Sequence, residues 1–146
     1  MSILGIGYEG LSLETFISRL RLHSADVLID VRLNAISRKK GFSKKSLDSA
    51  LEAAGILYLH MPSLGNERDN RDGYAELGSE PGESARSRFR TALAQQASAD
   101  DLRHVAELCA KQKVFVFCFE ADERHCHREQ VIEAVNKLAE RDLAAV

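Results

Sequence analysis

The residues best suited to chemistry lie in two short motifs, Cys118-Phe119-Glu120 and Cys126-His127-Arg128. Carboxylates and imidazoles transfer protons, thiolates act as nucleophiles, and a guanidinium forks onto a carboxylate or phosphate. Glu120 is therefore a candidate for acid–base work. Cys126 is a candidate nucleophile, because it is expected at a helix start, where the positive helix end and a protonated His127 would favour a thiolate. An inert Cys126 is the alternative.

Further polar residues follow the other apolar runs of the chain. Because the carboxyl ends of parallel strands meet at one edge of a sheet, a ligand is expected to bind where these residues converge. The alternative is that they only cap and link the elements. The candidate catalytic residues are Asp30, His60, Glu120 and Cys126, and the candidate substrate-binding residues are Tyr8, Arg32, Arg38, Arg128 and His127.

Arg128 is expected to be buried, because it shares a helical face with Ile132, Val135 and Ala139. Its guanidinium would then point toward the edge of the sheet, where Asp30 is the expected partner. Such a pair is either a structural clamp or part of a fork for a carboxylate or phosphate.

Two sharper motifs fit the chain less well. Cys118 and Arg124 match the C-x5-R loop of cysteine phosphatases and sulfurtransferases, but three acids and no glycine lie between them, which would repel an anion. A zinc site lacks the usual C-x2-C pair, so we assign no metal and no cofactor. Its ligands would come from Cys118, Cys126, His127 or His125, and His60.

The pattern of apolar residues predicts the elements that position these groups. Apolar runs at 3–6, 27–29, 56–59 and 114–119 predict strands, and stripes of helical period lie between and after them. Ser12 and Ser43 are expected helix N-caps, and Gly55 suits the left-handed position after a helix. Later helices are expected from about residue 85, from about residue 100 and over residues 126–141. Cys109 and Cys118 are expected in the core.

These elements predict the fold class. Strands that are apolar throughout favour a mostly parallel sheet of four or more strands, with helices on both faces. We expect a single three-layer α/β domain over residues 1–146. Residues 61–83 interrupt the pattern with several glycines and both prolines. A segment of this kind is usually a functional loop, a lid or a disordered insert.

Composition limits the classes of function. The net charge of -2 argues against a domain that binds nucleic acid through overall basicity, although the run Arg38-Lys39-Lys40 could attract phosphates. No apolar run is long enough to span a membrane, and no signal peptide is evident, so a cytoplasmic location is expected. Three cysteines do not form a disulfide framework.

Six motifs, in order along nearly the whole chain, resemble the bacterial and archaeal family called domain of unknown function 488. They are Gly7-Tyr8, Asp30-Val31-Arg32, Ser37-Arg38 with Gly41-Phe42-Ser43, Tyr58-Leu59-His60 with Leu64-Gly65-Asn66, Cys118-Phe119-Glu120 and Cys126-His127-Arg128. Residues 73–83 are outside the resemblance. The resemblance implies a compact α/β fold with the motifs clustered, and it implies no activity.

Three hypotheses for the function stay open at this point. The preferred one is an enzyme or ligand-processing domain that binds a small anionic or nucleotide-like substrate at the carboxyl edge of the sheet. The second is a non-enzymatic module that binds nucleic acid or a protein. The third is a thiol redox or metal site at Cys118 and Cys126.

Overall fold

Four apolar runs of the chain form one sheet of parallel strands. The computed structural model describes residues 2–144. The predicted strands are confirmed, with small shifts at their ends. Phe119, predicted as the last strand residue, lies beyond the sheet and is exposed. The strands are β1 (Ser2–Gly7), β2 (Val27–Asp30), β3 (Leu57–His60) and β4 (Lys113–Cys118). Their order across the sheet is β1-β4-β2-β3.

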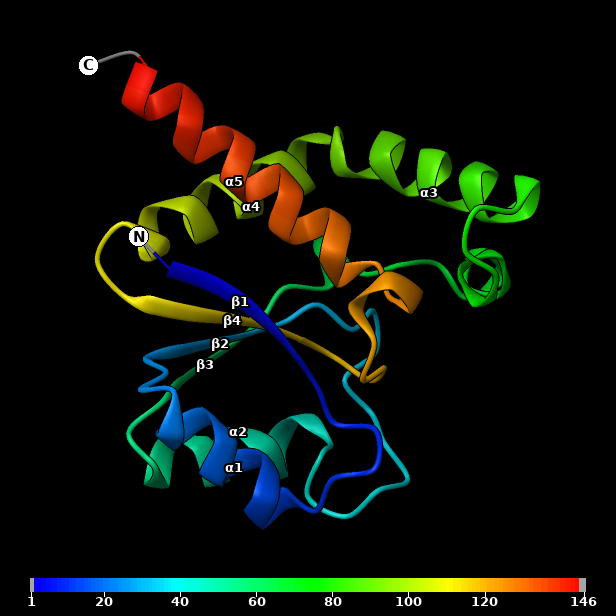
Figure 1. Cartoon of the computed structure of the whole chain (residues 1–146). Helices are drawn as coiled ribbons and strands as arrows, with labels where there is room; N and C mark the ends of the chain where they lie inside the picture. Colours follow the sequence, from blue (N-terminus) through cyan, green and yellow to red (C-terminus); the bar gives the residue numbers. More distant parts are fainter. Residues whose placement is uncertain (1, 145–146) are drawn as a thin grey trace.

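Helices cover both faces of the sheet, as the apolar strands predicted. Figure 1 shows α1 (Leu13–Leu22) and α2 (Lys44–Ala53) on one side, and α4 (Gln96–Cys109) and α5 (Arg128–Ala144) on the other. The remaining helix, α3 (Glu80–Leu93), contributes Phe89 and Leu93 to the core on the side of α4 and α5. The chain therefore has the three-layer α/β architecture.

Alternate residues of each central strand face opposite layers. In β4, Phe115 and Phe117 pack toward α1 and α2, whereas Val114, Val116 and Cys118 pack toward α4 and α5. Burial of each large apolar side chain contributes about 1.5–3 kcal/mol to stability. This alternation also decides on which side of the sheet the residues at each strand end emerge.

Local signals at the helix ends are partly as predicted. The Ser12 hydroxyl accepts a hydrogen bond from the Thr15 backbone N–H at 3.1 Å, and Gly55 has φ = 76° after α2. Ser43 occupies the N-cap position of α2, but its hydroxyl binds the backbone N–H and C=O of Ser37 instead of capping the helix. No described helix between residues 2 and 144 is long and apolar enough to cross a membrane.

Residues 61–83 are ordered by three short 3-10 helices, η1 (Pro62–Leu64), η2 (Arg68–Asn70) and η3 (Asp72–Ala75), and α3 begins at Glu80 instead of near residue 85. Leu64 and Tyr74 are buried. The Asn70 side-chain amide donates to the Asn66 side chain and to the Ala85 carbonyl, both at 2.9 Å. The segment therefore packs as part of the domain, and it is not the disordered insert that its composition allowed.

The strand order creates a crevice at the carboxyl edge of the sheet. The chain leaves β1 and β2 through α1 and α2 on one face, whereas it leaves β3 and β4 through α3, α4 and α5 on the other. Since β4 lies between β1 and β2, the segments after neighbouring strands diverge there. Such a switch point is where open parallel sheets bind ligands.

Gly7, at the end of β1, gives the first testable prediction. A Cβ on this residue would lie 1.9 Å from the Glu120 carbonyl oxygen, so Gly7→Ala must push the segment after β4 away. We expect a loss of about 1–3 kcal/mol in the free energy of unfolding, measured by urea denaturation. Ser18→Ala, on the exposed side of α1, is the control. Equal stability of the two variants would contradict the close approach.

Candidate functional site

The crevice at the carboxyl edge holds a pocket of about 140 Å³. Its walls come from the segments that follow β1, β2 and β4 and from residues 66–74, which lie in the segment without a periodic pattern. The side chains and backbone that line it belong to Tyr8, Arg32, Leu33, Asn34, Ile36, Asn66, Arg71, Tyr74, Cys118, Phe119, Glu120, His125, Cys126 and His127.

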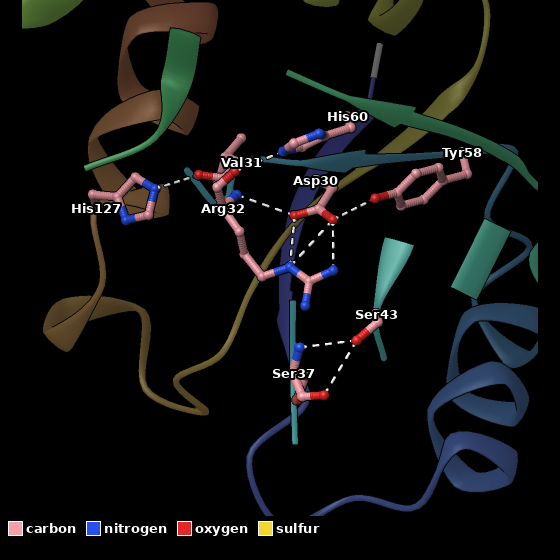
Figure 2. A network of polar contacts seen from close by, with 8 residues as sticks. All are labelled: Asp30, Val31, Arg32, Ser37, Ser43, Tyr58, His60 and His127. Atoms are coloured by element: carbon pink, nitrogen blue, oxygen red, sulfur yellow. Dashed lines mark hydrogen bonds and ion pairs between the residues drawn. The ribbon is translucent and has the colours of Figure 1, made fainter. Parts of the chain in front are cut away.

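Asp30 organises the side of the pocket nearest α1 and α2. Its carboxylate is completely buried and accepts hydrogen bonds from the Arg32 backbone N–H, from Arg32 Nε at 2.9 Å and from Arg32 Nη2 at 2.7 Å (Figure 2). The Tyr58 hydroxyl donates a further bond at 2.6 Å. Burial and this bond raise the pKa of Tyr58, so the hydroxyl stays protonated and remains a donor.

Arg32 is buried but keeps one free donor. Burial opposes its charge, but pairing with Asp30 outweighs burial and raises the pKa of the guanidinium. The guanidinium carbon lies 4.9 Å from the centre of the Phe117 ring and 5.6 Å from that of Tyr8, within cation–π range. Nη1, which points away from Asp30 in Figure 2, is buried without a hydrogen-bond partner.

A cluster of two thiols and an imidazole forms the side nearest α5. His127 Nδ1 lies 3.6 Å from Cys126 Sγ and 4.0 Å from Cys118 Sγ. The other ring nitrogen, Nε2, lies 2.8 Å from the Val31 carbonyl oxygen (Figure 2). Glu120 Oε2 is 3.5 Å from Cys118 Sγ. All three cluster residues are buried, and their ligand atoms lie within 4.8 Å of one another, close enough to hold a metal ion.

The buried groups of this cluster shift one another's ionisation. Hydrogen bonding with Cys126, reinforced by His127 against the effect of burial, holds the pKa of the Cys118 thiol well below its usual value. Burial raises the pKa of Cys126 well above its usual value. Burial opposes a charge on His127, but its contact with Cys118 outweighs burial and raises its pKa. Burial and the neighbouring Cys118 raise the pKa of Glu120.

Five of the nine sequence-predicted site residues line the pocket, namely Tyr8, Arg32, Glu120, Cys126 and His127. Asp30 lies behind Arg32 and binds it. His60 places Nε2 2.8 Å from the Arg32 carbonyl oxygen and does not line the pocket. Arg38 is exposed outside the pocket, and Arg128 also lies outside it.

The predicted pairing of Arg128 with Asp30 is wrong. Arg128 is buried, as its helical phase indicated, but it donates to the backbone carbonyls of Glu120 at 2.5 Å and Ala121 at 3.2 Å. Its Nε lies 3.5 Å from Glu123 Oε1 without hydrogen-bond geometry. The chain turns back after β4 directly over the start of α5, so the carbonyls of the turn reach the guanidinium before Asp30 can.

Cys118 and Arg124, the two ends of the C-x5-R match, lie in different surroundings. Cys118 is buried as predicted, but it lines the pocket beside Cys126 and His127 instead of serving only as core. Arg124 pairs with Asp122 at 2.8 Å, and 64% of its side chain is exposed. The C-x5-R segment therefore does not aim its arginine at Cys118, and it forms no phosphatase-type cradle.

Sequence reasoning missed the pocket residues that come from the segment after β3. Asn66, Arg71 and Tyr74 line the pocket, and burial raises the pKa of Tyr74 to about 12. The sequence did contain one indication that this segment contributes to the site, because Asn66 belongs to the Leu64-Gly65-Asn66 motif of the family resemblance. A Cβ on Gly65 would lie 2.6 Å from the Leu33 backbone, so this glycine lets the segment close over the end of β2.

The Asp30 network predicts a large effect on stability. Asp30→Ala leaves the buried Arg32 charge uncompensated, so the free energy of unfolding should fall by about 3–5 kcal/mol, measured by urea denaturation. Asp48→Ala, which removes an exposed acid on α2, should change it by less than about 0.5 kcal/mol. A loss for Asp30→Ala no larger than for this control would mean that the pair does not hold the strand ends together.

The ionisation of Cys118 predicts selective reactivity. The thiolate is the nucleophilic form, so iodoacetamide should alkylate Cys118 of the reduced, chelator-treated protein at neutral pH. Cys109 is the internal control, because burial raises its pKa to about 11. Peptide mass spectrometry at a series of pH values measures both sites. A Cys118 rate that falls with pH like that of an ordinary thiol would contradict the lowered pKa.

Comparison with known proteins identifies the family. The model of the family described as "Domain of unknown function DUF488" matches residues 12–135, which is most of the chain. No curated protein and no solved structure matches the sequence significantly. The matched range includes the Asp30-Val31-Arg32 and Cys126-His127-Arg128 motifs and all the pocket residues except Tyr8. The chain belongs to the DUF488 family.

Proposed function

We propose that this protein is an enzyme that binds a small anionic substrate in the pocket at the carboxyl edge of its sheet. One observation carries the proposal: Arg32, a buried cation, lines the same pocket as the buried thiol–imidazole cluster and the half-buried Glu120 carboxylate. A fixed cation beside groups capable of proton transfer and nucleophilic attack is expected where an enzyme holds an anion against its reacting groups.

Arg32 is the proposed anchor of the anion. Asp30 binds Nε and Nη2 and so fixes the plane of the guanidinium, which leaves Nη1 for another acceptor. A buried donor without a partner costs about 1–3 kcal/mol, and a ligand oxygen that reaches Nη1 by a local shift of its neighbours would recover this energy. Arg71 lines the same pocket and is exposed, so it adds a second positive charge at the entrance.

The size of the pocket favours a small substrate. Its volume of about 140 Å³ is below the roughly 300–1,000 Å³ typical of sites for drug-sized ligands and cofactors. This supports a small oxyanion or a short carboxylate over the nucleotide-like ligand that the sequence allowed. Nucleic acid has no part in the proposal, because Arg38 and its basic neighbours do not line the pocket.

The remaining residues take distinct proposed roles. Glu120 is the acid–base group, since its carboxylate lines the pocket beside Cys118. Cys118, Cys126 and His127 form the thiol–imidazole wall of the pocket that Arg32 also lines. Asp30 and His60 act through their contacts with Arg32, as positioning residues.

Binding of inorganic phosphate and sulfate tests the proposal. We expect both anions to raise the melting temperature of the protein, and Arg71→Ala to weaken their binding roughly 10- to 100-fold, as the loss of a charged hydrogen bond implies. Calorimetric titration measures the affinity. Arg68→Ala removes an exposed arginine of the neighbouring η2 that does not line the pocket, and it should bind as the unmodified protein does.

Two results would count against an anion-binding pocket. One is the absence of any stabilisation by phosphate, sulfate or small carboxylates. The other is equal weakening by Arg71→Ala and Arg68→Ala, because that would reflect only the general surface charge. Arg32→Lys adds a third readout if it folds: it keeps the charge but loses the fork, so anion affinity should fall even though the net charge does not change.

A further inference from the structure

The buried cluster opposite Arg32 brings three soft or borderline metal ligands together from two segments. Cys118 ends β4, whereas Cys126 and His127 lie in the turn that enters α5. One ligand atom from each lies within 4.8 Å of the other two, and all three residues are buried. Thiolate and imidazole are the ligands that structural and catalytic zinc sites use, with bonds of about 2.0–2.3 Å. The cluster therefore has the composition and the spacing of a zinc site.

The imidazole is oriented as a metal-binding histidine is. His127 Nε2 lies 2.8 Å from the Val31 carbonyl oxygen, and because a carbonyl only accepts hydrogen bonds, Nε2 must carry the proton. Nδ1, the other nitrogen, faces both sulfur atoms. Metal-binding histidines usually donate their distal N–H to a carbonyl or carboxylate in this way, which fixes the ring and directs the other nitrogen to the ion.

The position of His127 favours a bound cation over a disulfide between Cys118 and Cys126. A disulfide between Cys118 and Cys126 would leave Nδ1 of the buried His127 with no strong partner. A metal ion satisfies Nδ1 and both sulfurs at once, and it displaces their protons on binding. Arg128, a buried cation at the start of α5, does not compensate thiolates here, because it is already bound to the carbonyls of Glu120 and Ala121.

We propose that Cys118, Cys126 and His127 bind a zinc ion whose fourth coordination position faces the pocket. Three protein ligands with one open position distinguish catalytic zinc sites from closed structural ones. All three residues line the pocket, and Glu120 Oε2 lies 3.5 Å from Cys118 Sγ, beside that position. A water or an oxygen of the anion would take the open position, and Glu120, which lines the same pocket, would accept a proton from it.

The inference deepens the proposed function, because it rests on the same pocket: with zinc bound, Cys118, Cys126 and His127 act as ligands, and the metal becomes the reactive group. Metal content and anion binding are nevertheless separate measurements. Zinc that is present without any effect of phosphate or sulfate would leave the metal site intact and remove the anion pocket. Anion binding to a protein that takes up no zinc would do the reverse.

The test is the zinc content of the untagged protein, expressed with added zinc and purified without chelator, by elemental mass spectrometry. We expect about one ion per chain in the unmodified protein and in Cys109→Ser, which alters a buried cysteine of α4 outside the cluster. Cys118→Ser, Cys126→Ser and His127→Gln should each reduce the zinc content at least about 10-fold, as loss of a direct ligand should exceed the effect of an outer partner.

A second measurement covers variants that fail to fold. Reduced, metal-free protein of the natural sequence is titrated with Co²⁺, and the expected result is a sulfur-to-cobalt charge-transfer band with tetrahedral d–d bands. Zinc should abolish the bands and slow the alkylation of Cys118, whereas the slow alkylation of Cys109, which lies outside the cluster, should not change with zinc. Absence of both zinc and cobalt–thiolate absorption would overturn the proposal. So would a protein lighter by two hydrogen atoms, with Cys118 bound to Cys126, that takes up no metal after reduction.

Discussion

The buried carboxylate of Asp30 is the contact on which the carboxyl edge of the sheet depends. A charge without exposure to water is tolerated only when it is paired and hydrogen-bonded, and Asp30 meets this condition with Arg32 and Tyr58. Tyr58 belongs to β3, and the Arg32 guanidinium lies over the Phe117 ring of β4 and near Tyr8 after β1. One carboxylate therefore aligns groups from the ends of all four strands, which explains why the pocket forms at this edge.

Successive residues at the end of β2 face opposite helical layers, so the pocket receives side chains from both layers. Leu28 and Asp30 face α1 and α2, so the Arg32–Asp30 pair forms on that side. The next residue, Val31, packs with the opposite core and offers its carbonyl to His127 at the start of α5. The guanidinium and the thiol–imidazole cluster thus belong to opposite faces of the sheet, and both sets of residues line the pocket at the switch point, where β4 lies between β1 and β2 and the chain segments diverge.

Most of the fold could be predicted from the sequence because its signals are local. Apolar runs such as Val114–Phe117 and helical stripes such as the one containing Leu102 and Val105 need only neighbouring residues to be recognised.

The polar contacts of the site could be predicted only in part. The position of Arg128 on its helix predicted that its side chain is buried. It did not predict the hydrogen-bond partners of Arg128, because these depend on the path of the loop at 119–125. Cys118 was assigned to the core from its apolar neighbours, since nothing local reveals that the chain returns to it at Cys126. The pattern of apolar residues did not reveal residues 66–74, because 3-10 helices of three or four residues are too short to show a period.

The three consecutive residues of the Cys126-His127-Arg128 motif contact two different parts of the structure. Cys126 and His127 face the pocket, whereas Arg128 points the other way and binds the carbonyls of Glu120 and Ala121. This holds the backbone after β4 against β1, where Gly7 leaves room for the Glu120 carbonyl and Gly5 leaves room for the Glu123 side chain. Because the same backbone carries the side chains of Cys118 and Glu120, the buried arginine sets the position of two pocket groups without entering the pocket. An arginine here therefore follows from the need to fix a turn by its carbonyls, which a fork of rigid donors does better than a lysine.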